Sequence, residues 1–369
     1  MAPPYVCVTD FEEEAQKIID KKALDYYRSG AGEEFSLNLN REAFRRLRIR
    51  PRCLRDVSNL DTTCNILGYQ LKWPVGIAPT AMQKMAHSDG EGGNAKAAGE
   101  MGTIFIQSTL STMSIEEVAQ AAPDTCKWFQ LYVYKDRSLT ERILRRIEKA
   151  NFKAVVLTID APIFGQRWAD VRNNFSLPSH LRLANFDTRS SQSDGVHSEE
   201  GTSGINEYVA SQFDATLTWK DVQWLVKSTY LPIIVKGVLT AEDAVLAREF
   251  GCAGLIVSNH GARQVDYVPA SIEALPEIVK AVGDDMVVMM DGGVRHGNDV
   301  FKALALGAKM VFVGRPAIWG LGCGGSAGVK EMLKVLKRDF EVTMTLAGCQ
   351  KLKDIQKHMV VHESTYAKL

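Results

Sequence analysis

The chain has 369 residues, of which 46% are hydrophobic and 24% are charged, and its 44 basic side chains balance 44 acidic ones. This composition is typical of a folded protein with a large core, and a net charge of zero argues against electrostatic capture of nucleic acid or of an anionic membrane surface. No apolar run approaches the roughly 18 residues that a membrane span requires. The seven cysteines are scattered without a C-x-x-C, so neither a metal site nor a disulfide framework is indicated.

The N-terminal part, from about residue 8 to residue 48, is predicted to be helical, because Phe11 and Ala15 begin a series of apolar residues at helical spacing. Tyr26 and Tyr27 stand side by side just before Gly30, which ends the pattern. Packing could account for one ring and exposure for the other. The functional alternative is that one phenol points into a pocket.

From Pro74 onward, short apolar runs of strand length alternate with amphipathic helical segments, two of which open with a capping box, Ser114–Glu117 and Thr240–Asp243. Eight such alternations predict an α/β fold, a parallel (β/α)₈ barrel over residues 74–325, within a single domain of residues 1–369. An open doubly wound sheet is the alternative, but no G-x-G-x-x-G follows the first run. The runs are Val75–Ala78, Ile104–Ile106, Trp128–Val133, Ala154–Ile159, Ile233–Val235, Leu255–Val257, Val287–Met290 and Val311–Val313.

An insertion over about residues 165–218 separates the fourth and fifth strands. Residues 186–206 within it are rich in Ser, Asp, Gly and Glu and carry few large apolar side chains. Loops that follow barrel strands lie at the active-site end, so we predict a mobile lid rather than a linker between domains. Residues 327–358 are predicted to form one or two closing helices.

Polar or glycine residues follow the apolar runs at all eight strand ends. Each alone has an ordinary structural explanation, such as a hydroxyl bonded to backbone or a carboxylate that caps a helix. Together they predict one pocket at the carboxyl ends of the strands. They are Pro79-Thr80-Ala81, Gln107-Ser108, Gln130 with Tyr132, Thr158 with Asp160, Lys236-Gly237, His260 with Arg263, Asp291 to Arg295, and Gly314-Arg315.

The turns after strands seven and eight, Gly292–Arg295 and Gly314-Arg315, combine glycine with arginine. Glycine lets a backbone approach a phosphate closely, and arginine neutralises it. The neighbouring amide and hydroxyl side chains suit the edge of a flat ring, and Lys236 suits negative charge that develops on a reduced flavin. The pattern therefore predicts a site for flavin mononucleotide (FMN).

The stretch from Gly254 to Asp266 has the most specific chemistry. It opens as a buried strand and then places His260 and Arg263 three residues apart. A histidine can take a proton near neutral pH, and an arginine can hold a carboxylate through two parallel hydrogen bonds. The pair could deprotonate a small acid and hold it in place; the alternative is that His260 caps a strand and Arg263 is a solvated loop charge.

The motifs S-N-H-G-A-R-Q, D-G-G-V-R and A-L-A-L-G-A-K-M-V-F-V-G-R-P resemble those of the FMN-dependent L-2-hydroxyacid oxidases, the family of glycolate oxidase and long-chain hydroxyacid oxidase. The resemblance runs from about Tyr26 to the C-terminus and implies the role of each site residue. His260 resembles the base, Asp160 its partner, Arg167 and Arg263 the carboxylate-binding pair, and Tyr26 and Tyr132 the phenols that bind the substrate. The implied FMN contacts are Pro79, Thr80, Ala81, Ser108, Gln130, Thr158, Lys236, Ser258, Asp291, Gly293, Arg295, Gly314 and Arg315.

One position departs from the family. Glycolate oxidases carry a tryptophan where this chain has Leu110, and a leucine leaves more room and no N–H donor. We expect 2-hydroxy acids longer than glycolate to be accepted at least as well as glycolate. Trp168, next to Arg167, is a candidate to refill the space.

The resemblance also implies an activity, a location and an assembly. The implied reaction converts an L-2-hydroxy acid and O₂ to a 2-oxo acid and H₂O₂. The ending Ala367-Lys-Leu369 approximates a peroxisomal address that an import receptor reads. A homotetramer is expected from the family. The alternatives are a dehydrogenase of the same family that uses an acceptor other than oxygen, another FMN-binding barrel enzyme, and a binding protein without activity.

Overall fold

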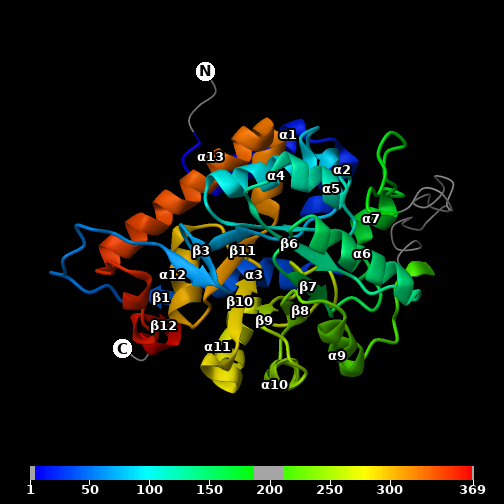
Figure 1. Cartoon of the computed structure of the whole chain (residues 1–369). Coiled ribbons are helices and arrows are strands. Elements are labelled where there is room, and N and C mark those ends of the chain that lie inside the picture. The colour runs from blue at the N-terminus through cyan, green and yellow to red at the C-terminus, as the bar shows by residue number, and fades with distance from the viewer. Residues whose placement is uncertain (1–4, 187–210, 368–369) are drawn as a thin grey trace.

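The computed structural model describes residues 5–186 and 211–367 of the chain. A closed barrel of parallel strands lies at its centre, in the spatial order β10-β11-β4-β5-β6-β7-β8-β9, and helices surround it (Figure 1). The predicted (β/α)₈ barrel is confirmed, and the doubly wound alternative is wrong. The barrel strands are β4 (Val75–Ile77), β5 (Ile104–Gln107), β6 (Cys126–Leu131), β7 (Val155–Thr158), β8 (Ile233–Val238), β9 (Gly254–Val257), β10 (Val287–Asp291) and β11 (Met310–Val313).

The strands are apolar on both faces because each face is covered. Ile104 and Ile106 of β5 belong to the core inside the barrel, whereas Phe105 between them belongs to the core beneath the helices. Trp128 and Phe312 meet inside the barrel with ring centroids 5.9 Å apart. This two-sided burial is why the sequence shows continuous apolar runs rather than alternation.

A hairpin of β2 (Cys64–Ile66) and β3 (Tyr69–Leu71), which the sequence did not predict, completes the inner core. Its turn holds Leu67 at φ +49° and Gly68 at φ +87°, as a tight hairpin turn requires. Ile66 and Leu71 join the cluster inside the barrel, to which the first residues of β6 and β10 also belong. The hairpin therefore covers the amino-terminal end of the barrel.

The helices follow the predicted alternation. The capping box at α5 is present, since Ser114 Oγ accepts from Glu117 N–H and Glu117 accepts from Ser114 N–H. The predicted N-terminal helical segment is divided into three helices. The helices are α1 (Val8–Ile18), α2 (Lys21–Arg28), α3 (Phe35–Arg45), α4 (Gly90–Glu100), α5 (Ile115–Ala121), α6 (Arg137–Lys149), α7 (Trp168–Arg172), α9 (Trp219–Ser228), α10 (Ala241–Glu249), α11 (Ser271–Val282), α12 (Gly297–Ala305) and α13 (Arg315–Ala347), with short 3₁₀ turns at Gln83–Met85, Gly283–Asp285, Leu352–Asp354, Lys357–Met359 and Glu363–Thr365.

Two expectations need adjustment. The closing helix α13 begins at Arg315, directly after β11, and is interrupted by the non-helical backbone of Gly324 and Gly325; its second part, which ends at Ala347, begins close to the predicted residue 327. The insertion between β7 and β8 contains α7 and α9, but residues 187–206 of the predicted lid lie outside the described residues.

A short two-stranded sheet joins the segment after α3 to the C-terminal segment. The strand β1 (Leu47–Ile49) pairs antiparallel with β12 (Val360–His362), near the C-terminus in Figure 1. Within residues 5–186 and 211–367, no helix is long and apolar enough to cross a bilayer.

Candidate active site

One pocket collects the side chains at the carboxyl ends of the barrel strands. Every predicted site residue lines it except Asp160 and Ser258, which contact residues of its wall. The predicted residues that line it are Tyr26, Pro79, Thr80, Ala81, Ser108, Leu110, Gln130, Tyr132, Thr158, Arg167, Lys236, His260, Arg263, Asp291, Gly293, Arg295, Gly314 and Arg315.

His260 lies in an unusual stretch of backbone just past β9. His260, Gly261 and Ala262 have φ angles of +59°, +60° and +61°, a left-handed run that is costly for residues with a side chain. Asn259 stabilises the turn, because its Oδ1 accepts from Ala262 N–H (3.1 Å) and its side chain exchanges two hydrogen bonds with Asn40 of α3. The strain is thus held by packing against the N-terminal helices, and it directs the imidazole into the pocket.

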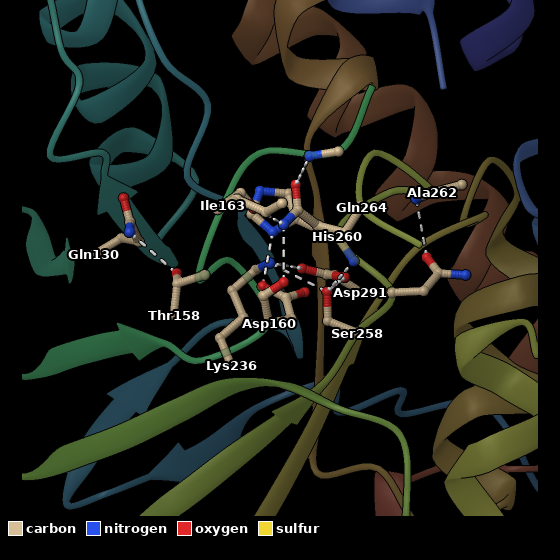
Figure 2. Close-up of polar contacts among 12 residues, drawn as sticks. Gln130, Thr158, Asp160, Ile163, Lys236, Ser258, His260, Ala262, Gln264 and Asp291 are labelled. Atoms are coloured by element: carbon tan, nitrogen blue, oxygen red, sulfur yellow. Dashed lines mark hydrogen bonds and ion pairs between the residues drawn. The ribbon is translucent and has the colours of Figure 1, made fainter. Parts of the chain in front are cut away.

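The imidazole is paired with a carboxylate. His260 Nδ1 lies 2.9 Å from Asp160 Oδ1, and Figure 2 shows the pair beside Lys236. Burial lowers the pKa of His260, Asp160 acts in the opposite direction, and the net direction is downward. Burial would raise the pKa of Asp160, but His260 and Lys236 hold it below its ordinary value. Near neutral pH, His260 is therefore a free base beside an ionised carboxylate.

Asp160 has room to approach His260 because residue 237 is a glycine. Gly237 has a φ of +108°, and a Cβ there would lie 2.4 Å from Asp160 Cγ. Gly165 likewise lets the loop after β7 pack closely against the loop that carries Arg263. A Cβ on Gly165 would lie 2.5 Å from the carbonyl oxygen of Arg263. The sequence analysis singled out neither constraint.

Two guanidinium groups, of which Arg167 is buried and Arg263 half-buried, line the same pocket. Arg263 lies 4.7 Å above the ring of Tyr26 and donates to the carbonyl oxygen of Ser29 at 3.0 Å. Arg167 is 2% exposed; its Nη1 lies 3.7 Å from Asp170 Oδ2, and its Nε has no hydrogen-bond partner among the described residues. Burial and the charge of Arg263 lower the pKa of Arg167 to about 10, so it stays protonated at neutral pH. Buried donors without acceptors are costly, and an anionic ligand would satisfy them.

Tyr132 lies in the wall next to these cations. Burial, followed by the charge of Asp160, raises the pKa of its phenol, so Tyr132 remains a hydrogen-bond donor. Tyr27 behaves differently from its neighbour Tyr26, because its hydroxyl donates to the carbonyl oxygen of Met82 at 2.7 Å. Tyr26 is thus the phenol whose ring lies among the arginines.

A network of hydrogen-bonded polar side chains, with Lys236 and Asp291 at one end, forms another part of the pocket wall. Gln130 Oε1 accepts from the Ser108 hydroxyl (3.3 Å), and its Nε2 donates to Thr158 Oγ1 (3.0 Å). Lys236 Nζ donates to Ser258 Oγ at 3.1 Å and lies 3.5 Å from Asp291 Oδ2. These contacts fix the orientation of the Gln130 side-chain amide and hold the Lys236 ammonium in the same pocket.

Glycine-rich turns form the remaining end of the pocket. Gly293 has a φ of +82°, and a Cβ on it would lie 2.1 Å from the carbonyl oxygen of Asn40. Arg295 Nε is buried and has no hydrogen-bond partner among the described residues. Arg315, by contrast, donates to the carbonyl oxygens of Tyr27, Ser29 and Gly261. Arg315 therefore also ties α2 to the His260 loop.

The N-terminal helices supply part of the lining that the sequence analysis missed. Asn40 acquires its role through Asn259, which lies 219 positions away, so no local pattern indicates it. The additional lining residues include Glu12, Tyr27, Arg28, Asn38, Asn40 and Arg41.

Comparison with known proteins identifies this architecture. The family model of FMN-dependent dehydrogenases matches residues 15–362. The chain belongs to that family. Glycolate oxidase 1 of Zea mays is 52% identical over 357 residues, covering 97% of this chain and 96% of the relative. Glycolate oxidase of Spinacia oleracea is 52% identical over 350 residues, covering 95% and 94%. Among solved structures, mandelate oxidase with (S)-4-hydroxymandelic acid aligns with a TM-score of 0.92 at 38% identity, covering 96% of this chain and 98% of that one.

The predicted family resemblance is thereby confirmed, and this FMN-dependent flavoprotein is an enzyme of the (S)-2-hydroxy-acid oxidase type. The pocket fits the cofactor. The buried guanidinium of Arg295, whose Nε lies 3.8 Å from Glu12 Oε2 without a hydrogen bond, the turn at Gly292-Gly293 and the first turn of α13 suit its phosphate. The amide of Gln130 and the ammonium of Lys236 suit the edge of its ring.

We expect Gly237→Ala to destabilise the protein more than Gly68→Ala does. Both glycines have positive φ, but a Cβ on Gly68 meets nothing within 4 Å, whereas one on Gly237 meets Asp160. Gly68→Ala should cost about 1 kcal/mol from backbone strain, and Gly237→Ala a further 1–3 kcal/mol or so from the clash. Unfolding in urea measures both free energies. Equal losses would contradict the close approach.

Proposed function

We propose that the protein oxidises an L-2-hydroxy acid with O₂ to the 2-oxo acid and H₂O₂, with His260 as the base. The observation that carries the proposal is that His260, paired with Asp160, lines the same pocket as the cations Arg167 and Arg263. Relatives named glycolate oxidase and mandelate oxidase support an α-hydroxy acid as the substrate class. A base and an anion clamp in one pocket suit a substrate whose carboxylate adjoins the reacting carbon.

Arg167 and Arg263 hold the substrate carboxylate in this proposal, with the Tyr26 and Tyr132 hydroxyls beside them. Each charge-assisted hydrogen bond is worth about 1.5–3 kcal/mol. Fixing the carboxylate fixes the adjacent carbon and its hydroxyl against His260. Orientation of this kind supplies a large part of the catalysis.

His260 accepts the substrate proton at Nε2, because Nδ1 is engaged by Asp160. The ionised Asp160 stabilises the imidazolium that results. FMN, when bound, would supply the acceptor for the two electrons and the second hydrogen that the substrate loses; O₂ would reoxidise it, and H₂O₂ would carry away both hydrogens. Lys236, held by Ser258 and Asp291, supplies positive charge where negative charge develops.

We further propose that the protein acts in peroxisomes. The C-terminal Ala-Lys-Leu and a product, H₂O₂, that such compartments handle support this location. Residues 368 and 369 lie outside the described part of the chain. The import receptor and the homotetramer remain predictions from the resemblance, as do the single-domain extent and the individual FMN contacts.

Anaerobic bleaching of the flavin absorbance tests the proposed function. L-Glycolate or L-2-hydroxyoctanoate should bleach the holoprotein, and air should restore the colour and release peroxide. In His260→Asn the protein should stay yellow, but bleaching should slow by about 10²–10⁴-fold because the base is lost. His180→Asn is the matched control, since His180 is exposed and lies outside the pocket.

Bleaching of His260→Asn at the wild-type rate would remove His260 from the mechanism. Wild-type protein that bleaches but does not recover in air would identify an acceptor other than oxygen. Protein that neither acid bleaches would point to a different FMN enzyme.

The pH profile tests the electrostatics of the pair. Burial holds the pKa of His260 below the ordinary 6.5, so kcat/KM should persist as the pH falls through that value. Asp160→Asn removes the charge that raises this pKa against the effects of Lys236 and Arg167. The acidic limb should then move to still lower pH, while kcat falls by about 10²-fold or more because the imidazolium loses its partner. A limb that moves to higher pH in Asp160→Asn would contradict this account.

The position of Leu110 bears on which chain length of 2-hydroxy acid the pocket accepts. Its side chain is 2% exposed and lines the pocket, whereas Trp168 is 42% exposed, does not line the pocket and lies beside Arg172. Trp168 therefore does not refill the space.

Leu110→Trp should lower the kcat/KM for 2-hydroxyoctanoate relative to glycolate by about tenfold or more. Leu110→Met, which keeps the volume, should preserve the ratio. An unchanged ratio in Leu110→Trp would show that residue 110 does not set chain length.

A further inference from the structure

One side chain, that of Gln264, bridges the two loops that carry His260 and Asp160. Its Nε2 donates to the carbonyl oxygens of Asp160 (2.8 Å) and Ile163 (2.9 Å), as Figure 2 shows. Its Oε1 accepts from the N–H of Gly165 at 3.1 Å. Because a carbonyl oxygen accepts only from the NH₂ group of the carboxamide, these partners determine the orientation of the amide.

The loop after β7 depends on these hydrogen bonds for its conformation. Pro162 and Ile163 are exposed, and the described residues 160–166 form neither helix nor strand. An exposed, irregular segment gains little from apolar packing, so hydrogen bonds to a neighbouring element largely determine where it lies. Gln264 supplies such bonds at three positions of this loop.

The two loops are also in direct backbone contact. A Cβ on Gly165 would lie 2.5 Å from the carbonyl oxygens of both Arg263 and Gln264. The missing side chain at Gly165 therefore allows the close approach, and the carboxamide of Gln264 holds it.

Asp160 is held at two points by the loop that follows β9. Its carbonyl oxygen accepts from Gln264, and its carboxylate lies 2.9 Å from His260 Nδ1. A displacement of the Asp160 backbone would move the carboxylate away from the imidazole. The hydrogen bond to the backbone therefore protects the contact between the side chains.

We propose that Gln264 is a positioning residue for the reaction: its carboxamide fixes the backbone of Asp160 so that the carboxylate stays in hydrogen-bond contact with His260. Gln264 does not line the pocket, so it acts through Asp160 and not on the ligand. Loss of the carboxamide weakens the contact that stabilises protonated His260. The effect on turnover rests on the proposed function, but the effect on the titration of His260 does not.

The titration of His260 reports this contact directly. Burial lowers the pKa of His260, Asp160 raises it, and Lys236 and Arg167 lower it further. A weaker contact with Asp160 therefore lowers the pKa. Other ionisable side chains that line the pocket with His260, and that a change at residue 264 leaves in place, include Tyr26, Tyr132, Arg263 and Asp291.

Gln264→Met is the test, because it keeps an uncharged side chain of similar length but removes all three hydrogen bonds. The midpoint of the His260 titration should move to lower pH by about 0.5 or more. Nuclear magnetic resonance of the FMN-loaded protein, isotope-labelled in its histidine rings, measures it; the His260 signal is the one that His260→Asn lacks. The kcat for the hydroxy acid should fall about tenfold or more, since the carboxylate is misplaced.

Two further variants frame this result. Gln264→Asn, whose carboxamide is one methylene shorter, should move the His260 midpoint in the same direction. Gln356→Met is the matched control, because Gln356 Nε2 donates to the carbonyl oxygen of Lys353 at 2.6 Å but lies outside the pocket lining. It should change neither the midpoint nor kcat.

A double-mutant cycle separates positioning from a general loss of stability. In the Asp160→Asn background, Gln264→Met should lower kcat by less than about twofold, because the contact through which Gln264 acts is already gone. Reductions in kcat that multiply, or a His260 midpoint unchanged in both Gln264 variants, would overturn the proposal. Failure of the proposed function is distinguishable: the wild type would not turn over the hydroxy acid, yet the His260 midpoint would still move in Gln264→Met.

Discussion

The hydrogen bond between Asp160 and His260 is the interaction on which the rest of the site depends. Its two partners follow different strands, β7 and β9, and β8 lies between those strands in the barrel. Closure of the barrel sets their separation, and the absence of a side chain at Gly237 leaves room for the carboxylate. The barrel thus turns a contact between residues 100 positions apart into a fixed 2.9 Å distance. The position of the imidazole and its pKa both depend on this contact.

The left-handed backbone at residues 260–262 shows how such a site is supported. A strained turn persists only where surrounding contacts determine it. Here the support comes from the N-terminal helices, through the Asn40–Asn259 pair and the hydrogen bonds of Arg315. Those helices lie outside the barrel repeat, yet they hold its most chemically specific loop. Their place in the fold is therefore functional as well as structural.

The barrel and most of the pocket lining could be predicted from the sequence because parallel strands buried on two faces leave continuous apolar runs, and their polar ends must converge. Local patterns carry that information. The contributions of Asn40 and Gly237 could not be predicted, because each depends on a partner distant in sequence. The hairpin β2–β3 was missed for a related reason: Ile66 and Leu71 acquire their core role only when the barrel closes over them.

The β2–β3 hairpin closes one end of the barrel, so only the end at the carboxyl ends of the strands is open. Its apolar side chains fill the amino-terminal opening, so a ligand of the pocket must enter and leave through the opposite face. Orientation therefore matters when the protein is attached to a solid support. Gln70, exposed on the hairpin, is an attachment point on the face away from the chemistry. A molecule tethered there would expose the entrance of its pocket to the solution. Random coupling through surface lysines would leave the pocket entrance of some molecules facing the support.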